Sequence, residues 1–103
     1  MSRKILLLQG HPDASAVHFG HSLAEAYARA ARAAGHEVRI IRVADLEFPL
    51  LRSKAAWDTE AMPPMLQPAQ DAILRAEHIV LFFPLWLGDM PALVKGFLEQ
   101  VAR

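Results

Sequence analysis

The chain has 103 residues, which is enough for one domain but too few for two. Its 11 basic and 11 acidic residues cancel, so no net charge favours nucleic acid or an anionic membrane as a partner. The absence of cysteine excludes disulfides, thiolate catalysis and cysteine-based metal sites, and it fits the cytoplasm, where we expect the protein to reside. A 53% hydrophobic content indicates a globular chain rather than a disordered one.

Apolar periodicity predicts strands and helices that alternate along the chain. Short runs of large apolar residues predict strands at residues 4–9, 37–43 and 79–83. Steps of three and four predict helices at residues 20–34, 68–77 and 91–101. Gly35 is expected to end the first helix, whereas Pro68 and Pro91 are expected to open the other two. Residues 45–64 contain three prolines and are expected to be irregular.

Side-chain spacing adds three local expectations. The stripe of the first helix that faces the sheet is expected to contain Leu23, Tyr27, Ala30, Ala31 and Ala34. In the second helix, Asp71 and Arg75 lie four residues apart and are expected to form an exposed ion pair. Trp57, in the irregular stretch, is interpreted as a packing residue.

The alternation of strands and helices predicts an α/β fold with a parallel sheet and helices on both faces. The first and third strands are the most hydrophobic and are expected to be buried on both faces, which gives the order 2-1-3. The loops at residues 10–19 and 84–90 then face each other across a crevice. If no strand follows the third, its edge is unprotected, so we expect a homodimer in which this strand pairs antiparallel with its copy.

The two loops that line this crevice suggest a ligand. The first leads into a helix N-terminus, where free N–H groups and the helix dipole attract an anion, although it is neither a P-loop nor a dinucleotide-binding glycine motif. The second offers backbone amides and the flat apolar surface of Leu85 and Trp86. An anion site and a planar pocket in one crevice, between the first and third strands where the strand order reverses, favour a flavin nucleotide.

Other functional classes fit less well. Five histidines could suggest a metal site. The chain has no cysteine, and no carboxylate lies at a suitable spacing from the histidines, which disfavours a zinc site with four protein ligands. No G-x-S-x-G motif is present, which disfavours a serine hydrolase. A module that binds a partner without catalysis stays open as an alternative.

Several motifs bear a family likeness that covers nearly the whole chain. Residues 9–13 read QGHPD, residues 23–27 LAEAY, residues 35–38 GHEV and residues 83–93 FPLWLGDMPAL. Together they resemble the flavodoxin-like NAD(P)H:quinone oxidoreductases, a family that includes ancillary subunits of potassium-efflux systems. The chain resembles the N-terminal part of that flavodoxin-like domain, over residues 1–103.

The resemblance implies FMN or FAD held without a covalent bond. The cofactor phosphates would lie at His11 and at residues 15–20, which include Ser15, His18, Phe19 and Gly20. The isoalloxazine ring would lie along Pro84, Leu85, Trp86 and Leu87. Hydride would pass from NAD(P)H to the flavin, and two electrons would then pass to a quinone. The resemblance also implies, as an alternative, a regulatory module that binds flavin or a partner, such as a transporter at the membrane periphery.

Two departures from the family pattern affect these expectations. His18-Phe19-Gly20 stands where the family usually has Ser-Phe-Asn, so an amide is lost and the choice between FMN and FAD stays open. Family members also continue with further strands and substrate-contacting residues. We therefore interpret the chain as a fragment, a truncated product or a half-length relative, assign no catalytic residue and expect weak or absent turnover from the chain alone.

Overall fold

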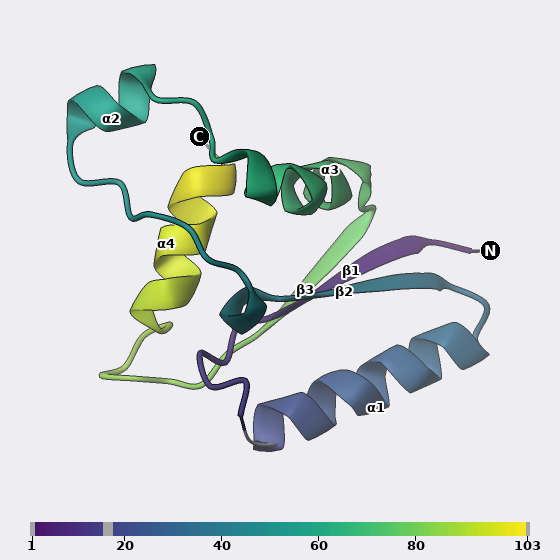
Figure 1. Ribbon diagram of the computed structural model, residues 1–103. Helices are drawn as coiled ribbons and strands as arrows, with labels where there is room; N and C mark the ends of the chain where they lie inside the picture. The colour runs from purple at the N-terminus through teal and green to yellow at the C-terminus, as the bar shows by residue number, and fades with distance from the viewer. Residues whose placement is uncertain (1, 16–17, 103) are drawn as a thin grey trace.

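The computed structural model describes residues 2–15 and 18–102 as a three-stranded sheet with helices on both faces (Figure 1). The strands are β1 (Lys4–Gln9), β2 (Glu37–Arg42) and β3 (His78–Phe82). The helices are α1 (Phe19–Ala33), α2 (Lys54–Thr59), α3 (Gln67–Arg75) and α4 (Ala92–Val101). Both strand pairings are parallel and the spatial order is β2-β1-β3, so the predicted α/β fold class and strand order are confirmed.

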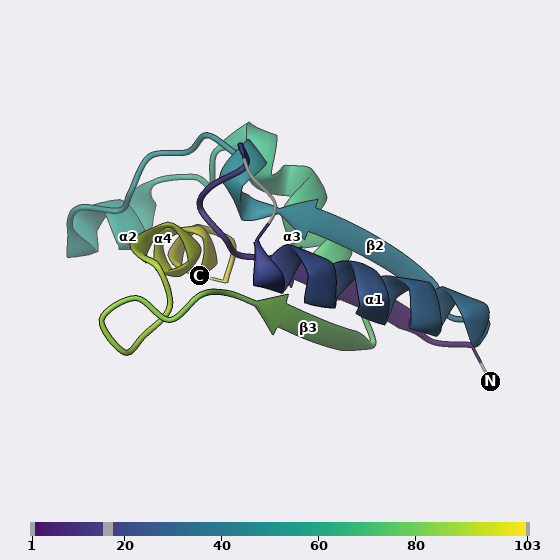
Figure 2. The same ribbon diagram turned by 90° about the horizontal axis from the view of Figure 1, so that it is seen from below.

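The central strand β1 is buried along most of its length. Figure 1 shows α1 on one side of the sheet and α3 and α4 on the other, and Figure 2 shows β1 behind α1, between β2 and β3. Successive side chains of a strand point to opposite faces, so Leu6 and Leu8 pack with α3 and α4, whereas Ile5 and Leu7 pack on the α1 side. This double burial explains the unbroken apolar run in the sequence. The core residues of α4, Val94, Phe97 and Val101, lie on the face predicted from their spacing.

The inward stripe predicted for α1 is wrong by about one residue. Ala24 and Ala28 are the buried residues of this helix, whereas Leu23 is 43% exposed. Of the other predicted members, Ala30 and Ala34 are exposed, and only Tyr27 and Ala31 are half-buried. An Ala-rich helix leaves several stripes with similar hydrophobicity, and the smaller side chains lie against the sheet. Gly35 follows the helix with φ of 90°, as predicted for a glycine at a helix end.

The stretch predicted to be irregular contains regular structure. The helix α2 begins after Ser53, whose hydroxyl accepts a hydrogen bond from the Ala56 N–H at 3.0 Å. Two 3₁₀ turns, Val43–Asp45 and Pro64–Leu66, flank this region. Trp57 lies on α2 with 44% of its surface exposed, so it is only partly packed.

A buried amide holds the segment after β2 against the last helix. Gln100 is buried, and its Nε2 donates to the Pro49 carbonyl at 2.8 Å. The ring of Phe48 meets that of Phe97 with centroids 6.2 Å apart. The segment that crosses from β2 toward α3 is therefore fixed over α4 despite its lack of long helices.

Two further expectations are corrected by the structure. The strand β3 lies at the edge of the sheet, and Ile79 is 45% exposed, so this strand is not buried on both faces. Asp71 does not pair with Arg75: its Oδ1 accepts from Nε2 of Gln67 at 2.8 Å, and no ion pair among the described residues involves Arg75. A glutamine one turn earlier competes for the same carboxylate.

Candidate functional site

The loops after β1 and β3 meet at the carboxyl end of the sheet, and a glycine makes this approach possible. The Gly10 N–H donates to the Phe82 carbonyl at 2.7 Å. A Cβ at Gly10 would lie 2.7 Å from Val94 Cγ2 and 2.9 Å from the Phe82 carbonyl oxygen. No larger residue fits without displacing backbone, so Gly10 sets the spacing of the two loops. We call residues 9–15, 18–22 and 83–91 the loop junction.

An aromatic contact joins the two sides of the loop junction. His11, from the first loop, is 9% exposed, and its ring meets the ring of Trp86 edge-on with centroids 6.0 Å apart. Sequence reasoning placed these two residues at neighbouring strand ends, and the structure brings their side chains together.

Three imidazoles gather on the first-loop side of the junction. The rings of His11 and His18 stack with centroids 3.9 Å apart, and His21 lies 5.4 Å from His11 and 5.6 Å from His18. Asp13 holds this group in place, because its Oδ2 lies 3.0 Å from Nε2 of His18. The sequence analysis singled out His11 and His18 for phosphate contact but gave no role to Asp13. The tight turn expected at residues 12–15 was the only sequence feature that pointed to Asp13.

Hydrogen bonds fix which ring nitrogens can donate. Nδ1 of His11 accepts from the Asp13 N–H at 3.1 Å, and Nδ1 of His21 accepts from the His18 N–H at 3.0 Å. In the neutral imidazole the proton then resides on Nε2, so both rings present an Nε2–H donor. The loop junction therefore carries hydrogen-bond donors suited to an anion at the start of α1.

Electrostatics and burial shift two ionisation equilibria here. Burial lowers the pKa of His11, and the neighbouring charges of His18 and His21 lower it further against a smaller opposing effect of Asp13. The pKa of the Asp13 carboxyl is held well below its usual range, mainly by the Ser15 hydroxyl and then by His18. At neutral pH Asp13 is therefore an anion and His11 is neutral.

Gln9 is a positioning residue that sequence reasoning missed. It is 4% exposed, its Oε1 accepts from the His11 N–H at 3.2 Å and its Nε2 donates to the Gly20 carbonyl at 3.2 Å. One side chain thus connects the end of β1, the first loop and the first turn of α1. The signal was available, because a glutamine that ends an otherwise apolar buried strand needs polar partners.

The second loop is a tight hairpin that displays apolar side chains. Trp86 and Asp89 exchange backbone hydrogen bonds of 2.9 and 3.2 Å, and the residues between them, Leu87 and Gly88, have φ of 54° and 78°. Positive φ at both central positions is the signature of a type I′ turn. Leu87 is strained in that conformation and fully exposed, and Leu85 is 72% exposed.

The remaining predicted residues differ in accessibility. Phe19 is 77% exposed at the start of α1, Gly20 follows it with open space around its Cα, and Pro84 is half-buried. Ser15 is exposed and bonded to Asp13. Residues 16–17, which belong to the predicted phosphate loop, lie outside the described residues.

A hollow beside this loop is lined by Gln9, Ala14, Ser15, His21, Ala24, Glu25, Ile40 and Arg42.

The described residues lack the features of two other classes of site. They contain no group of three or more histidine or carboxylate side chains arranged to hold a metal ion. Across residues 2–15 and 18–102, every helix is too short or too polar to cross a membrane.

Comparison with known proteins identifies the family. A family model described as flavodoxin-like fold matches residues 3–103. The chain belongs to this family. The family assignment agrees with the β2-β1-β3 order and with the position of the loop junction at the carboxyl ends of β1 and β3.

Relatives of this flavodoxin-like chain are oxidoreductases by name. An uncharacterized NAD(P)H oxidoreductase of Haemophilus influenzae is 29% identical over 99 residues, which cover 93% of this chain and 48% of that protein. The NAD(P)H:quinone oxidoreductase from Methanothermobacter marburgensis superposes with a TM-score of 0.80 at 23% identity and covers 98% of this chain and 54% of that one. An NADH:FMN oxidoreductase in apo form gives 0.69 at 27% identity, covering 96% and 50%. The chain thus spans about half the length of these relatives.

Proposed function

We propose that the loop junction binds a flavin nucleotide and that this chain supplies the flavin-binding part of an NAD(P)H:quinone oxidoreductase. The observation that carries the proposal is the contact between His11 and Trp86. It puts a cluster of imidazole donors and a flat apolar side chain side by side, which matches the two chemically different ends of a flavin nucleotide. The names of the relatives, including the NADH:FMN oxidoreductase, support the same reading.

On the phosphate side, this chain would supply imidazole and backbone donors rather than a lysine. The Nε2–H groups of His11 and His21 and the first turn of α1 would donate to phosphate oxygens. His18 would stay anchored on Asp13 and keep the stack in register. Ser15, Phe19 and Gly20 would border the same phosphates. Because the family amide is replaced by Gly20, these imidazoles would carry more of the phosphate affinity than the backbone alone.

On the ring side, the hairpin at residues 86–89 would support the isoalloxazine. Pro84, Leu85, Trp86 and Leu87 would cover the ring edge and exclude water, and the exposed Leu85 and Leu87 would become buried on binding. The strained turn at Leu87 holds these side chains outward. Bound flavin would supply hydride acceptance and two-electron transfer, whereas the protein would supply position and electrostatics.

The substrates proposed for the complete oxidoreductase are NAD(P)H and a quinone. The described residues offer one side of a flavin site, and a reaction of this kind gains from water exclusion and fixed dipoles. We therefore expect weak or absent turnover from this chain alone. FMN and FAD both fit the donors of the loop junction, and the NADH:FMN oxidoreductase relative supports FMN. Lack of cysteine supports a cytoplasmic location.

We further propose that the chain is a homodimer formed through β3. This strand lies at the edge of the sheet, its only described neighbour is β1, and its sequence HIVLF carries no lysine or proline to discourage pairing. Two copies related by a two-fold axis would pair antiparallel and extend the sheet to six strands, twice the three that the described residues form.

The function is tested by the absorbance spectrum of the purified protein, titration with FMN and FAD, and NAD(P)H oxidation with a quinone. We expect flavin bands or saturable flavin binding. Binding without turnover, even after complementation with the rest of a relative's fold, would favour the regulatory-module alternative. No flavin binding would contradict the proposal, and the exposed apolar hairpin would then be better explained as a surface for a protein partner, such as a transporter.

A further inference from the structure

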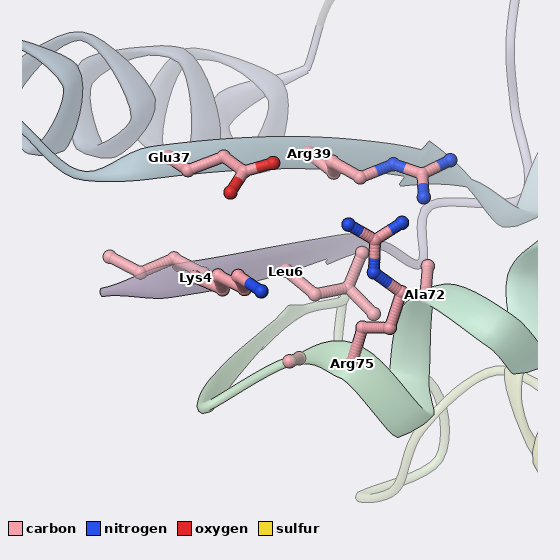
Figure 3. A pocket seen from close by; sticks show the side chains of 8 residues that line it. Lys4, Leu6, Glu37, Arg39, Ala72 and Arg75 are labelled. Atoms are coloured by element: carbon pink, nitrogen blue, oxygen red, sulfur yellow. The ribbon is translucent and has the colours of Figure 1, made fainter. Parts of the chain in front are cut away.

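A small hollow lies at the amino end of the sheet, and Figure 3 shows the side chains that line it. The loop junction lies at the opposite end, after β1 and β3. It is formed by the first halves of β1 and β2 and by the last turn of α3. Its lining residues are Lys4, Ile5, Leu6, Glu37, Arg39, Ala72, Arg75 and Ala76. The floor is apolar, because Leu6 is 1% and Ala72 is 3% exposed.

Two guanidinium groups meet over this floor. Arg39 projects from β2, where it is the register partner of Leu6, and Arg75 projects from the last turn of α3. Figure 3 shows the Arg75 side chain rising toward that of Arg39, so that the two charged groups lie on the same side of the hollow. Like charges over an apolar floor repel each other unless an anion or water lies with them.

The carboxylates of this region are engaged elsewhere or do not reach the two arginines. Asp71, the expected partner of Arg75, accepts from Gln67 instead. Glu77 accepts from the Lys4 N–H at 3.0 Å and pairs with Arg3 at 4.0 Å. Glu37 lines the hollow, but no ion pair in the described part of the chain joins it to either arginine. Two planar donor groups are thus left with no protein acceptor among the described residues.

We propose that Arg39 and Arg75 form a binding site for a small oxyanion of the phosphate class. Each guanidinium presents parallel N–H donors that match two oxygens of a tetrahedral oxyanion. The hollow is small, with a volume of about 20 Å³, so the bound group is small or is the phosphate end of a larger molecule, and part of it extends into solvent. The two guanidinium charges favour a dianion over a singly charged carboxylate, whereas Glu37, which also lines the hollow, opposes any anion.

The site would connect two elements that otherwise share few contacts at this end. An oxyanion bound to Arg39 and Arg75 bridges the edge strand β2 to the crossover helix α3, so occupancy would stabilise the folded chain by mass action. The site is separate from the flavin proposal, since none of its residues belongs to the loop junction.

The test is a phosphate titration followed by NMR signals of the arginine Nε–H groups and by thermal unfolding at constant ionic strength. We expect saturable shifts of the Arg39 and Arg75 signals and a rise in midpoint temperature with phosphate, a smaller effect with sulfate and none with acetate. Arg39→Gln and Arg75→Gln should each weaken phosphate binding at least tenfold, whereas Arg52→Gln, on an exposed arginine elsewhere, should not.

Controls separate this site from the loop junction and from loss of fold. His11→Ala should leave the Arg39 and Arg75 shifts unchanged, because any phosphate at the loop junction is remote from them. Arg75→Lys keeps the charge but loses the planar fork, and it should bind with intermediate affinity. Absence of saturable shifts in the wild type would overturn the proposal. An equal loss in the Arg52 variant, or shifts that vanish with His11→Ala, would also overturn it.

Discussion

Replacing Gly10 with alanine tests whether close approach of the two loops builds the loop junction. The new Cβ would lie 2.7 Å from Val94 Cγ2, 2.9 Å from the Phe82 carbonyl oxygen and 3.2 Å from Phe83 Cβ. Val94 is fully buried, so it cannot swing aside without disturbing α4. Overpacking of this kind costs about 1–3 kcal/mol. The lower conformational entropy of unfolded alanine offsets only about 0.4–1 kcal/mol of that cost.

Taken at the middle of both ranges, the net loss is about 1.3 kcal/mol, which lowers the unfolding temperature by roughly 5–10 °C for a chain of this size. Gly20→Ala is the matched control, because a Cβ there meets nothing within 4 Å and alanine is favoured in a helix. It should leave the unfolding temperature unchanged or raise it slightly. Differential scanning calorimetry of both variants measures the difference. If Gly10→Ala unfolds at the wild-type temperature, the tight approach of the loops is not a feature of the folded chain.

Three further predictions concern pH, strain and assembly. Because the pKa of His11 is lowered in the folded state, the unfolded chain binds more protons below about pH 6.5. Denaturant titrations should therefore show the free energy of unfolding falling as the pH drops through that range, and His11→Gln should reduce this fall. An equal pH dependence in both proteins would contradict the prediction. Leu87→Asn should raise the unfolding temperature, because asparagine tolerates positive φ. The same substitution should weaken flavin binding. A lower unfolding temperature would show that Leu87 is not strained. Sedimentation should show a dimer that Ile79→Lys shifts toward the 11.4 kDa monomer, and a monomeric wild type at high concentration would refute pairing through β3.

The parts of the fold set by periodicity could be predicted from sequence. Two buried faces make β1 an unbroken apolar run, and the position of this strand gives the sheet order. Where periodicity is ambiguous the predictions failed. The alanines of α1 offered several equivalent stripes, so Ala24 and Ala28 were not singled out. The short helix α2 depends on the Ser53 cap, which is a weak signal in a stretch with several prolines.

The candidate site was predicted in its position but not in its internal contacts. Strand order alone brings the loops of His11 and Trp86 to one end of the sheet. The stacking of His11 on His18, the anchor on Asp13 and the bridge made by Gln9 depend on tertiary geometry. A carboxylate with two competing donors is equally hard to assign, which is why Asp71 was expected to bind Arg75 rather than Gln67.

Flavin titration of three variants tests the central claim most directly. His11→Ala and Trp86→Ala remove the two sides of the loop junction, whereas Trp57→Ala removes a tryptophan that lies on α2, outside the junction. Quenching of FMN or FAD fluorescence reports affinity, and circular dichroism confirms that each variant folds. We expect affinity to fall at least tenfold in the first two variants and to stay at the wild-type value in Trp57→Ala. Unchanged affinity in both junction variants, or an equal loss in Trp57→Ala, would contradict flavin binding at this site.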